Sequence, residues 1–272
     1  MLKQRVLTAL VLAVGFLVAV FALSAWGFAL FLAVVTGLCA CEWAGISGVR
    51  DTAVRNGYVA GLVALYLVLQ PLAVDEDAVR LLALLASAWW VGIAALMYLS
   101  PVAPTPASGY SVFYLLAGPA TILPGLLCAQ FLRHAYGEGS AWLLLLALAL
   151  VWAMDIGAYF SGKRWGRRKL APSISPGKSW EGVVGGIAAL LCLWAFALLV
   201  RTSTEPGAGV LFAAVMLAGG LSVLGDLFES RAKRMSGVKD SGRLLPGHGG
   251  ILDRLDSAFV ALPLFVFFLL WL

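Results

Sequence analysis

Long apolar runs separated by short polar segments recur from one end of this sequence to the other. About 20 mostly apolar residues are what an α-helix needs to cross the hydrocarbon core of a bilayer. Strands of a membrane barrel would alternate polar and apolar residues, whereas residues 143–152 and 258–272 are apolar on all sides. The pattern therefore predicts an all-α, polytopic integral membrane protein.

The composition supports the same fold class. Hydrophobic residues make up 62% of the chain, and Asp, Glu, Lys and Arg only 12%, against about 25% in a soluble domain. The net charge of +5 does not indicate nucleic acid, because the basic residues cluster between apolar runs, where membrane topology explains them. The four cysteines lie inside apolar runs without a C-x-x-C pair, so we expect neither disulfides nor a cysteine metal site.

Nine membrane spans are predicted from the apolar runs. The first run resembles a signal peptide, but it continues past Trp26 without a clear cleavage site, and we interpret it as two retained spans. Only the short break at residues 24–27 separates them. The nine expected spans are 6–23, 26–44, 57–73, 80–99, 111–132, 141–160, 182–200, 208–228 and 256–272.

The basic residues test this count, because cytoplasmic loops carry an excess of Lys and Arg. With a cytoplasmic N-terminus, all of the 19 basic residues except Arg80, Arg133 and Arg201 fall on the inner side. We expect a single membrane domain over residues 1–272. Residues 1–140 would form its scaffold, and residues 141–272 would supply the catalytic helices and two cytoplasmic loops.

Two carboxylates lie where a membrane protein rarely tolerates them. Asp155 and Asp226 fall within or at the inner ends of predicted spans. A charged side chain costs about 2.5–3.5 kcal/mol at mid-helix on insertion scales unless it is paired or hydrated. A buried pair with Lys or Arg, or snorkelling to the interface, is the structural alternative. We favour a functional role for both.

Two acidic pairs have helical spacing. Asp226 and Glu229 are three residues apart, as are Asp253 and Asp256, which puts each pair on one helix face. Both pairs adjoin the same loop, so they can converge, and a divalent cation would relieve their repulsion. Oxygen-only ligands favour Mg²⁺, which shares its shell with substrate phosphates. Helix-terminal charges without a metal are the alternative.

Cations and glycines surround these acids. Lys and Arg neutralise phosphate oxygens, and Gly lets the backbone approach a phosphate closely, which favours phosphoryl-transfer chemistry on the inner side. Topology alone could explain the basic residues near 164–169, and His248 beside glycines could be merely exposed. No G-x-x-x-x-G-K-[ST] phosphate loop occurs, and for the glycines of 182–186 we expect close helix packing.

The segment 230–256 closely resembles the signature of phosphatidate cytidylyltransferases, also called CDP-diacylglycerol synthases. Ala232 departs from the larger apolar residue usual there, but no chemistry depends on it. Glu42-Trp43 fits the family more loosely. The matching stretches are Ser-Arg-Ala-Lys-Arg at 230–234, Lys-Asp at 239–240, Leu-Pro-Gly-His-Gly-Gly-Ile-Leu-Asp-Arg-Leu-Asp at 245–256, and the upstream Asp155-x-Gly-Ala-Tyr, Ser-Pro-Gly-Lys-Ser-x-Glu-Gly at 175–182 and Gly-Asp at 225–226.

The resemblance implies transfer of the cytidylyl group from CTP to phosphatidate, giving CDP-diacylglycerol and pyrophosphate for phospholipid synthesis. It implies a multi-pass protein of the bacterial inner (plasma) membrane whose active site faces the cytoplasm, and it is compatible with a homodimer. It also implies Mg²⁺, with a monovalent cation such as K⁺ as a second ion. Carried over by motif, the metal ligands would be Asp226, Asp253 and Asp256, with Asp155 at the second cation.

The resemblance also assigns the other polar residues. As a hypothesis, the lipid phosphate attacks the α-phosphorus of CTP in line, without a general base, since a phosphate monoester is already anionic near pH 7. The residues expected in catalysis are Lys178, Lys233, Arg234, Lys239, His248 and Arg254. Those expected to bind substrates are Ser175, Lys178, Ser179, Ser230, Lys233, Arg234, Lys239, Gly249 and Gly250.

Two other functions fit parts of the pattern. A CTP-dependent polyprenol or phytol kinase would share the membrane character and the nucleotide, but the full run from Lys239 to Asp256 favours the cytidylyltransferase. An ion-coupled transporter would scatter its charged residues near the midplane of the membrane, whereas here they gather at one surface. A CDP-alcohol phosphotransferase would carry D-G-x2-A-R, which does not occur.

Overall fold

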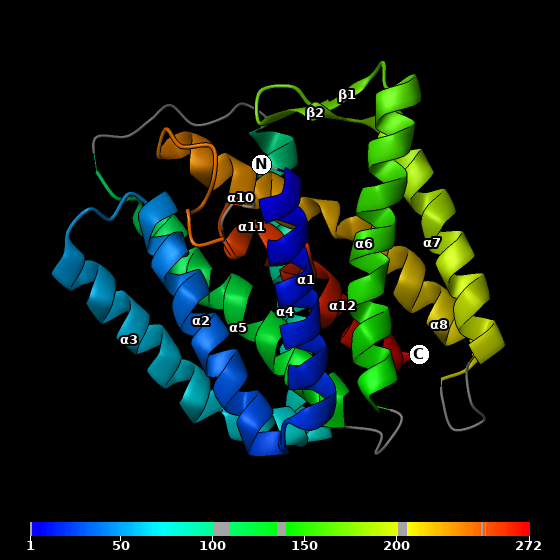
Figure 1. The fold of residues 1–272 in the computed structure, drawn as a ribbon, viewed down its shortest axis with the longest axis horizontal. Coiled ribbons are helices and arrows are strands. Elements are labelled where there is room, and N and C mark those ends of the chain that lie inside the picture. The colour runs from blue at the N-terminus through cyan, green and yellow to red at the C-terminus, as the bar shows by residue number, and fades with distance from the viewer. Residues whose placement is uncertain (1, 101–108, 135–139, 201–205, 246, 248) are drawn as a thin grey trace.

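The protein is a bundle of long helices, described by a computed structural model over residues 2–100, 109–134, 140–200, 206–245, 247 and 249–272 (Figure 1). The first part comprises α1 (Leu2–Ala22), α2 (Ala25–Ile46), α3 (Thr52–Leu69), the 3-10 turn η1 (Gln70–Val74), α4 (Glu76–Leu99), α5 (Val112–His134) and α6 (Ser140–Trp165). Then follow β1 (Lys169–Ala171), β2 (Ser175–Ser179), α7 (Trp180–Val200), α8 (Ala208–Ala213), the π-helical η3 (Ala214–Ala218), α9 (Gly219–Leu221), α10 (Val223–Met235), α11 (Leu252–Leu255) and α12 (Ala258–Trp271).

The predicted all-α membrane fold is confirmed. Within the described residues, eight helical segments are long and apolar enough to cross a bilayer, and they coincide with the second to ninth predicted spans. The first predicted span is also helical, as α1. Where its side chains are described, however, its apolar segment is Leu10–Ala22, which is shorter than a full span. The structure therefore supports eight of the nine spans by length and composition.

Side-chain caps begin three of these helices. The Ser24 hydroxyl accepts the N–H of Gly27 at 3.1 Å, and Asp51 and Asp75 accept N–H groups three residues ahead at 3.0 and 2.9 Å. Such caps satisfy backbone donors that have no partner within the helix. The short break at 24–27 is thus a genuine boundary between α1 and α2.

Helices α2, α5 and α12 form the centre of the bundle. In each, 56–61% of the residues in the most apolar stretch are buried inside the protein, against 17% for α7 and for the segment that begins with α3. The aromatic side chains of Trp43, Trp90, Phe228 and Phe259 are almost fully buried there. Since α3 and α7 are as apolar as their neighbours but far more exposed, lipid must cover their outer faces.

Small residues let α6 and α7 pack closely. A Cβ at Gly157 would overlap the carbonyl oxygen of Gly185, and one at Gly185 would overlap the Ser161 side chain. A Cβ at Gly186 would likewise overlap Met154. The close helix packing predicted for the glycines of 182–186 is therefore confirmed.

A small hairpin joins α6 to α7. This hairpin was not predicted from the sequence. Strands β1 and β2 pair antiparallel, with Lys169 opposite Ser179 and Ala171 opposite Ser175. Glu181 closes the base of the hairpin by accepting the backbone N–H groups of Arg167 at 3.0 Å and Arg168 at 3.2 Å. In Figure 1 the hairpin lies at the same end of the bundle as the start of α1 and α10.

The eighth span is interrupted and longer than predicted. The π-helical turn η3 and the bend at Ser222 separate α8 from α10, and Ser222 donates its hydroxyl to the Gly219 carbonyl at 2.7 Å. Helix α10 then continues to Met235, beyond the expected end at residue 228. Glu229, Ser230, Lys233 and Arg234 consequently lie on a helix, and the predicted end of this span at residue 228, which would have left them in a loop, is wrong.

Candidate active site

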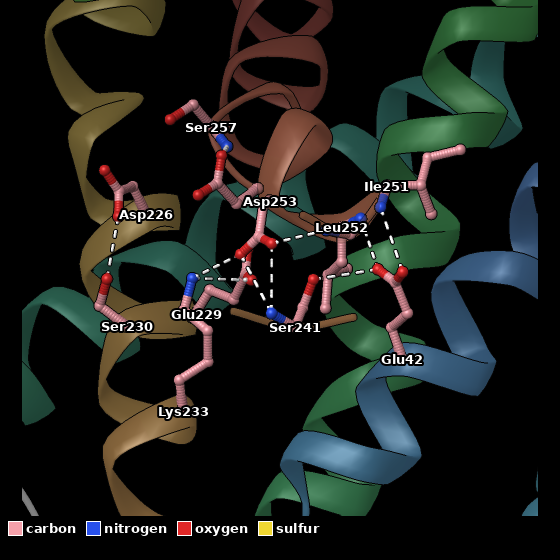
Figure 2. A network of polar contacts seen from close by, with 12 residues as sticks. Glu42, Asp226, Glu229, Ser230, Lys233, Ser241, Ile251, Leu252, Asp253 and Ser257 are labelled. Atoms are coloured by element: carbon pink, nitrogen blue, oxygen red, sulfur yellow. Dashed lines mark hydrogen bonds and ion pairs between the residues drawn. The ribbon is translucent and has the colours of Figure 1, made fainter. Parts of the chain in front are cut away.

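Most of the acidic and basic residues singled out in the sequence meet at one end of the bundle. They lie on α10, on α11 and in the loop between them, with the end of α2 on the other side (Figure 2). In Figure 2 side chains from all three helices point into one network. The predicted convergence of the two acidic segments is therefore seen in the fold.

Asp226 lies in the first turn of α10 and is held from two sides. Lys178 of β2 places its Nζ 2.7 Å from Asp226 Oδ2, and Ser230, one turn further along α10, donates its hydroxyl to Oδ1 at 3.0 Å. Both side chains of the ion pair remain partly accessible, at 22% and 33%. This contact joins the hairpin to the broken span, and it leaves room for a substrate to compete for either charge.

Lys233 is held by two buried carboxylates. Its Nζ lies 2.7 Å from Asp253 Oδ1 and 3.1 Å from Glu229 Oε1, and its side chain is only 10% exposed. The other three cations expected to bind substrate, Lys178, Arg234 and Lys239, are more accessible. A buried charge is stable only when it is paired, so Lys233 serves first to neutralise Glu229 and Asp253.

Asp253 also fixes the loop between α10 and α11. It accepts the backbone N–H of Ser241 at 3.1 Å and that of Gly250 at 2.9 Å. Gly249 precedes this contact with a φ of +83°, a backbone conformation that glycine adopts without strain. With Lys233 added, nearly all the acceptor positions of the Asp253 carboxylate are taken.

Asp256 lies next to Asp226, across a tight backbone contact. The charges of the two carboxylates interact, and Ser257 donates its N–H to Asp256 Oδ1 at 2.6 Å. A Cβ at Gly225 would overlap the carbonyl oxygen of Asp256. The absence of a side chain at residue 225 is therefore what lets the two acidic segments approach.

We expect Gly225→Ala to lower activity by separating the two acidic segments. The added methyl group must displace backbone atoms, and overpacking of this kind costs about 1–3 kcal/mol. The measurement is the thermal melting point in detergent together with the transfer rate. Gly209→Ala is the matched control, because a Cβ there meets nothing within 4 Å; equal behaviour of the two variants would contradict the packing argument.

Glu42 of α2 joins the site from the other half of the chain. Its carboxylate accepts the Ser241 hydroxyl at 3.0 Å, and the N–H groups of Ile251 at 3.2 Å and Leu252 at 2.9 Å. The side chain is buried at 7% exposure. It therefore binds the start of α11 from the side opposite Lys233 (Figure 2).

The remaining predicted residues lie around this centre. Arg234 donates its Nε–H to the Ile174 carbonyl at 3.4 Å, which ties α10 to the hairpin. Ser179 accepts the N–H of Gly182 at 3.2 Å and so caps α7. His248 lies outside the described residues. Four further predicted residues are partly or fully exposed: Asp155, Ser175, Lys239 and Arg254.

The four acids predicted as metal ligands do not form one compact cluster. Within the described residues, no group of three or more His, Cys, Asp or Glu side chains could hold a metal ion. Asp253 is committed to Lys233 and to backbone donors, whereas Asp226 and Asp256 remain as an interacting pair. One or two carboxylates completed by substrate phosphates are the usual protein share of a Mg²⁺ site. The donors present therefore fit a Mg²⁺ ion shared with substrate.

Three residues of the network, Glu42, Glu229 and Ser241, were not among the predicted site residues. Glu229 had helical spacing to Asp226 but is the partner of Lys233, four residues ahead. Glu42 and Ser241 meet across 199 positions of sequence, which no local pattern reveals. For Glu42 two signals were available, a carboxylate within a predicted span and the looser family resemblance of Glu42-Trp43.

Together, the fold and the site define an integral membrane protein with paired acids and lysines at one end of its helices. The chain belongs to the cytidylyltransferase family, because the sequence model described as "Cytidylyltransferase family" matches residues 3–272. The phosphatidate cytidylyltransferase of Haemophilus influenzae is 39% identical over 285 residues, covering 98% of each chain. That of Pseudomonas aeruginosa is 43% identical over 274 residues, covering 100% of this chain and 97% of its own.

Proposed function

We propose that this protein transfers the cytidylyl group of CTP to phosphatidate, giving CDP-diacylglycerol and pyrophosphate. The family membership and the full-length similarity to two phosphatidate cytidylyltransferases support this reaction. The observation that carries it is the pairing of Lys178 with Asp226 beside Asp256. Acids and cations side by side are what a reaction between two phosphates requires.

In the proposed reaction, a phosphate oxygen of phosphatidate attacks the α-phosphorus of CTP. The new bond to that oxygen forms as the bond from the α-phosphorus to the bridging oxygen breaks, and pyrophosphate leaves with that electron pair. No general base is needed, since the attacking phosphate is already anionic near pH 7. The protein contributes position and charge.

Lys178 and Arg234 are the best-placed cations for the phosphates. Lys178 is partly exposed and bound to a single carboxylate, so its charge is available when another cation occupies Asp226. Arg234 donates its Nε–H to the hairpin, and this contact fixes the orientation of the guanidinium group that would bind a phosphate. Lys239, exposed on the following loop, would add charge toward the nucleotide. Lys233 instead holds the acids in place.

Asp226 and Asp256 would hold a Mg²⁺ ion. Such an ion, when bound, neutralises the triphosphate and polarises the α-phosphorus. Asp155 interacts electrostatically with Lys178 and Asp226, and it would orient Lys178 or hold a second cation such as K⁺. Asp253 acts on this pair indirectly, through Lys233 and the loop.

We also propose that the site faces the cytoplasm from a bacterial inner membrane. The named relatives are bacterial. The hairpin region and α10, which carry many of the basic residues, lie at one end of the bundle in Figure 1, and the positive-inside rule then favours the cytoplasm for that end. The acyl chains of phosphatidate would then stay in the bilayer while CTP arrives from water. A homodimer remains a prediction of the family resemblance.

The alternatives explain fewer of the contacts. A polyprenol or phytol kinase would use the same nucleotide, but the full-length relatives carry a different name and reaction. A transporter would need charged residues along a path through the membrane, whereas Glu42, Asp226 and Asp253 lie close to one another in Figure 2.

The test supplies purified protein in detergent with Mg²⁺, phosphatidate and CTP labelled at the α-phosphorus. We expect label to enter the lipid fraction only when phosphatidate is present, with release of one pyrophosphate for each lipid labelled. CTP labelled at the γ-phosphorus should leave the lipid unlabelled. Transfer of the γ-label to a polyprenol would instead reject the cytidylyltransferase and support a kinase.

A further inference from the structure

Glu42 has a buried carboxylate whose hydrogen-bond donors are neutral groups. It lies in the last turns of α2, within a membrane-spanning segment, where an unsatisfied carboxylate costs several kcal/mol. Among the described residues, no ion pair joins Glu42 to a cation, in contrast to Asp226, Glu229 and Asp253. Hydrogen bonds therefore satisfy the oxygens of this buried carboxylate.

Three donors from a distant segment supply those bonds. The Ser241 hydroxyl and the Leu252 N–H reach Oε2, and the Ile251 N–H reaches Oε1, at 2.9–3.2 Å. All three donors lie 199–210 positions further along the chain. The carboxylate therefore joins the loop after α10 and the start of α11 to the scaffold helix α2.

Two glycines of the loop, Gly242 and Gly250, pack directly against the Glu42 side chain. A Cβ at Gly242 would overlap the carboxylate of Glu42, and a Cβ at Gly250 would overlap both that carboxylate and the Ser241 hydroxyl. Only residues without a side chain let the loop wrap so tightly around the anion. The two glycines thus have a packing role that complements the phosphate-binding role expected for Gly250 from the sequence.

The donors that serve Glu42 belong to the same segments that serve Asp253. Ser241 gives its hydroxyl to Glu42 and its N–H to Asp253, and Gly250, which precedes Ile251, donates its N–H to Asp253. Asp253 in turn holds Lys233. Figure 2 shows the two carboxylates on opposite sides of the Ser241 backbone.

We propose that Glu42 is a positioning residue for cytidylyl transfer: its carboxylate fixes the loop and α11, and thereby the rotation of Asp253 and Asp256 relative to α10. The role in cytidylyl transfer rests on the proposed function, whereas the contacts of Glu42 with the loop and α11 do not depend on it. Glu42 itself touches no substrate. Its effect travels through Ser241 and the first backbone amides of α11.

The test compares Glu42→Gln with the wild-type protein. The amide keeps the shape, but one of its two ends becomes a donor facing the N–H of Ile251 or Leu252, so at least one hydrogen bond is lost. We expect kcat per folded molecule to fall by about 10- to 100-fold, with a smaller change in KM, because misplaced groups cost rate more than binding. Glu76→Gln is the matched control, an exposed glutamate of α4 that pairs with Arg80.

Hydrogen exchange measured by mass spectrometry gives a readout independent of turnover. In Glu42→Gln we expect amides of residues 241–252 to exchange at least about tenfold faster, and amides of α4 to be unchanged. A purely stabilising role would instead lower the melting point and speed exchange throughout the bundle, with normal kcat in the molecules that remain folded. That outcome, or unchanged exchange at 241–252, would overturn the proposal.

A milder variant covers the case in which Glu42→Gln does not fold. Ser241→Ala removes only the hydroxyl donor to Glu42 and keeps the N–H that binds Asp253. We expect a loss of a few fold in kcat and faster local exchange; wild-type values for both would reject the proposal. If wild-type protein transfers no label, the proposed function fails, but the exchange data still decide whether Glu42 fixes the loop.

Discussion

Asp226→Asn is expected to lower cytidylyl transfer by roughly 1,000-fold or more, which is the scale of losing an electrostatic group at a reaction centre. The amide fills the same space and can still accept the Ser230 hydroxyl bond, so the fold should persist. What disappears is the charge that pairs with Lys178 and that would face a divalent cation. Initial rates with labelled CTP and phosphatidate measure the loss.

Binding of Mn²⁺ provides a second measurement for Asp226→Asn. Electron paramagnetic resonance reports free and bound Mn²⁺ directly, and we expect the variant to bind it at least about tenfold more weakly. Asp77→Asn is the matched control, since Asp77 also lies in the first turn of a long helix but is 93% exposed. If Asp226→Asn kept more than a tenth of the activity, the site assignment would be wrong.

The membrane architecture could be predicted from the sequence because hydrophobicity acts locally. A run of apolar residues either is or is not long enough to span lipid, and the second to ninth predicted spans match the structure for that reason. The boundary between the first two spans was legible as well, because Ser24 caps α2 within three residues. Such signals need no knowledge of distant contacts.

The allocation of charges within the site could not be predicted in the same way. Helical spacing placed Asp226 and Glu229 on one face, yet each pairs with a different lysine. Lys178 lies on strand β2 and reaches Asp226 only because β2 pairs with β1 in the hairpin. Which lysine meets which acid depends on tertiary packing, and a motif gives the residue types but not their partners.

The extension of α10 changes what its cations do. A loop would have let Lys233 follow a substrate, but a helix fixes its side chain one turn after Glu229, where an ion pair forms. The motif was thus informative about the location of the site and misleading about Lys233. A residue in a functional motif can act on the acids rather than on the ligand.

Lys233→Met is therefore expected to destabilise the protein as well as to inactivate it. Removing the ammonium group leaves Glu229 and Asp253 as unpaired buried carboxylates, and breaking a buried pair on one side costs roughly 3–5 kcal/mol. The melting point in detergent measures this loss. Lys239→Met is the matched stability control, because Lys239 is exposed four residues after the end of α10; equal melting points for the two variants would contradict the burial argument.

Adding Glu229→Gln to Lys233→Met separates stability from function. The second change replaces the Glu229 carboxylate, which pairs with Lys233, by a neutral amide, while Asp253 keeps its bonds from Ser241 and Gly250. We expect the double variant to regain a large part of the lost melting temperature, since an unpaired buried charge is then neutral. Activity should not return with it, because Asp253 still lacks the cation that sets its position. Recovery of activity together with stability would show that Lys233 is needed only for folding.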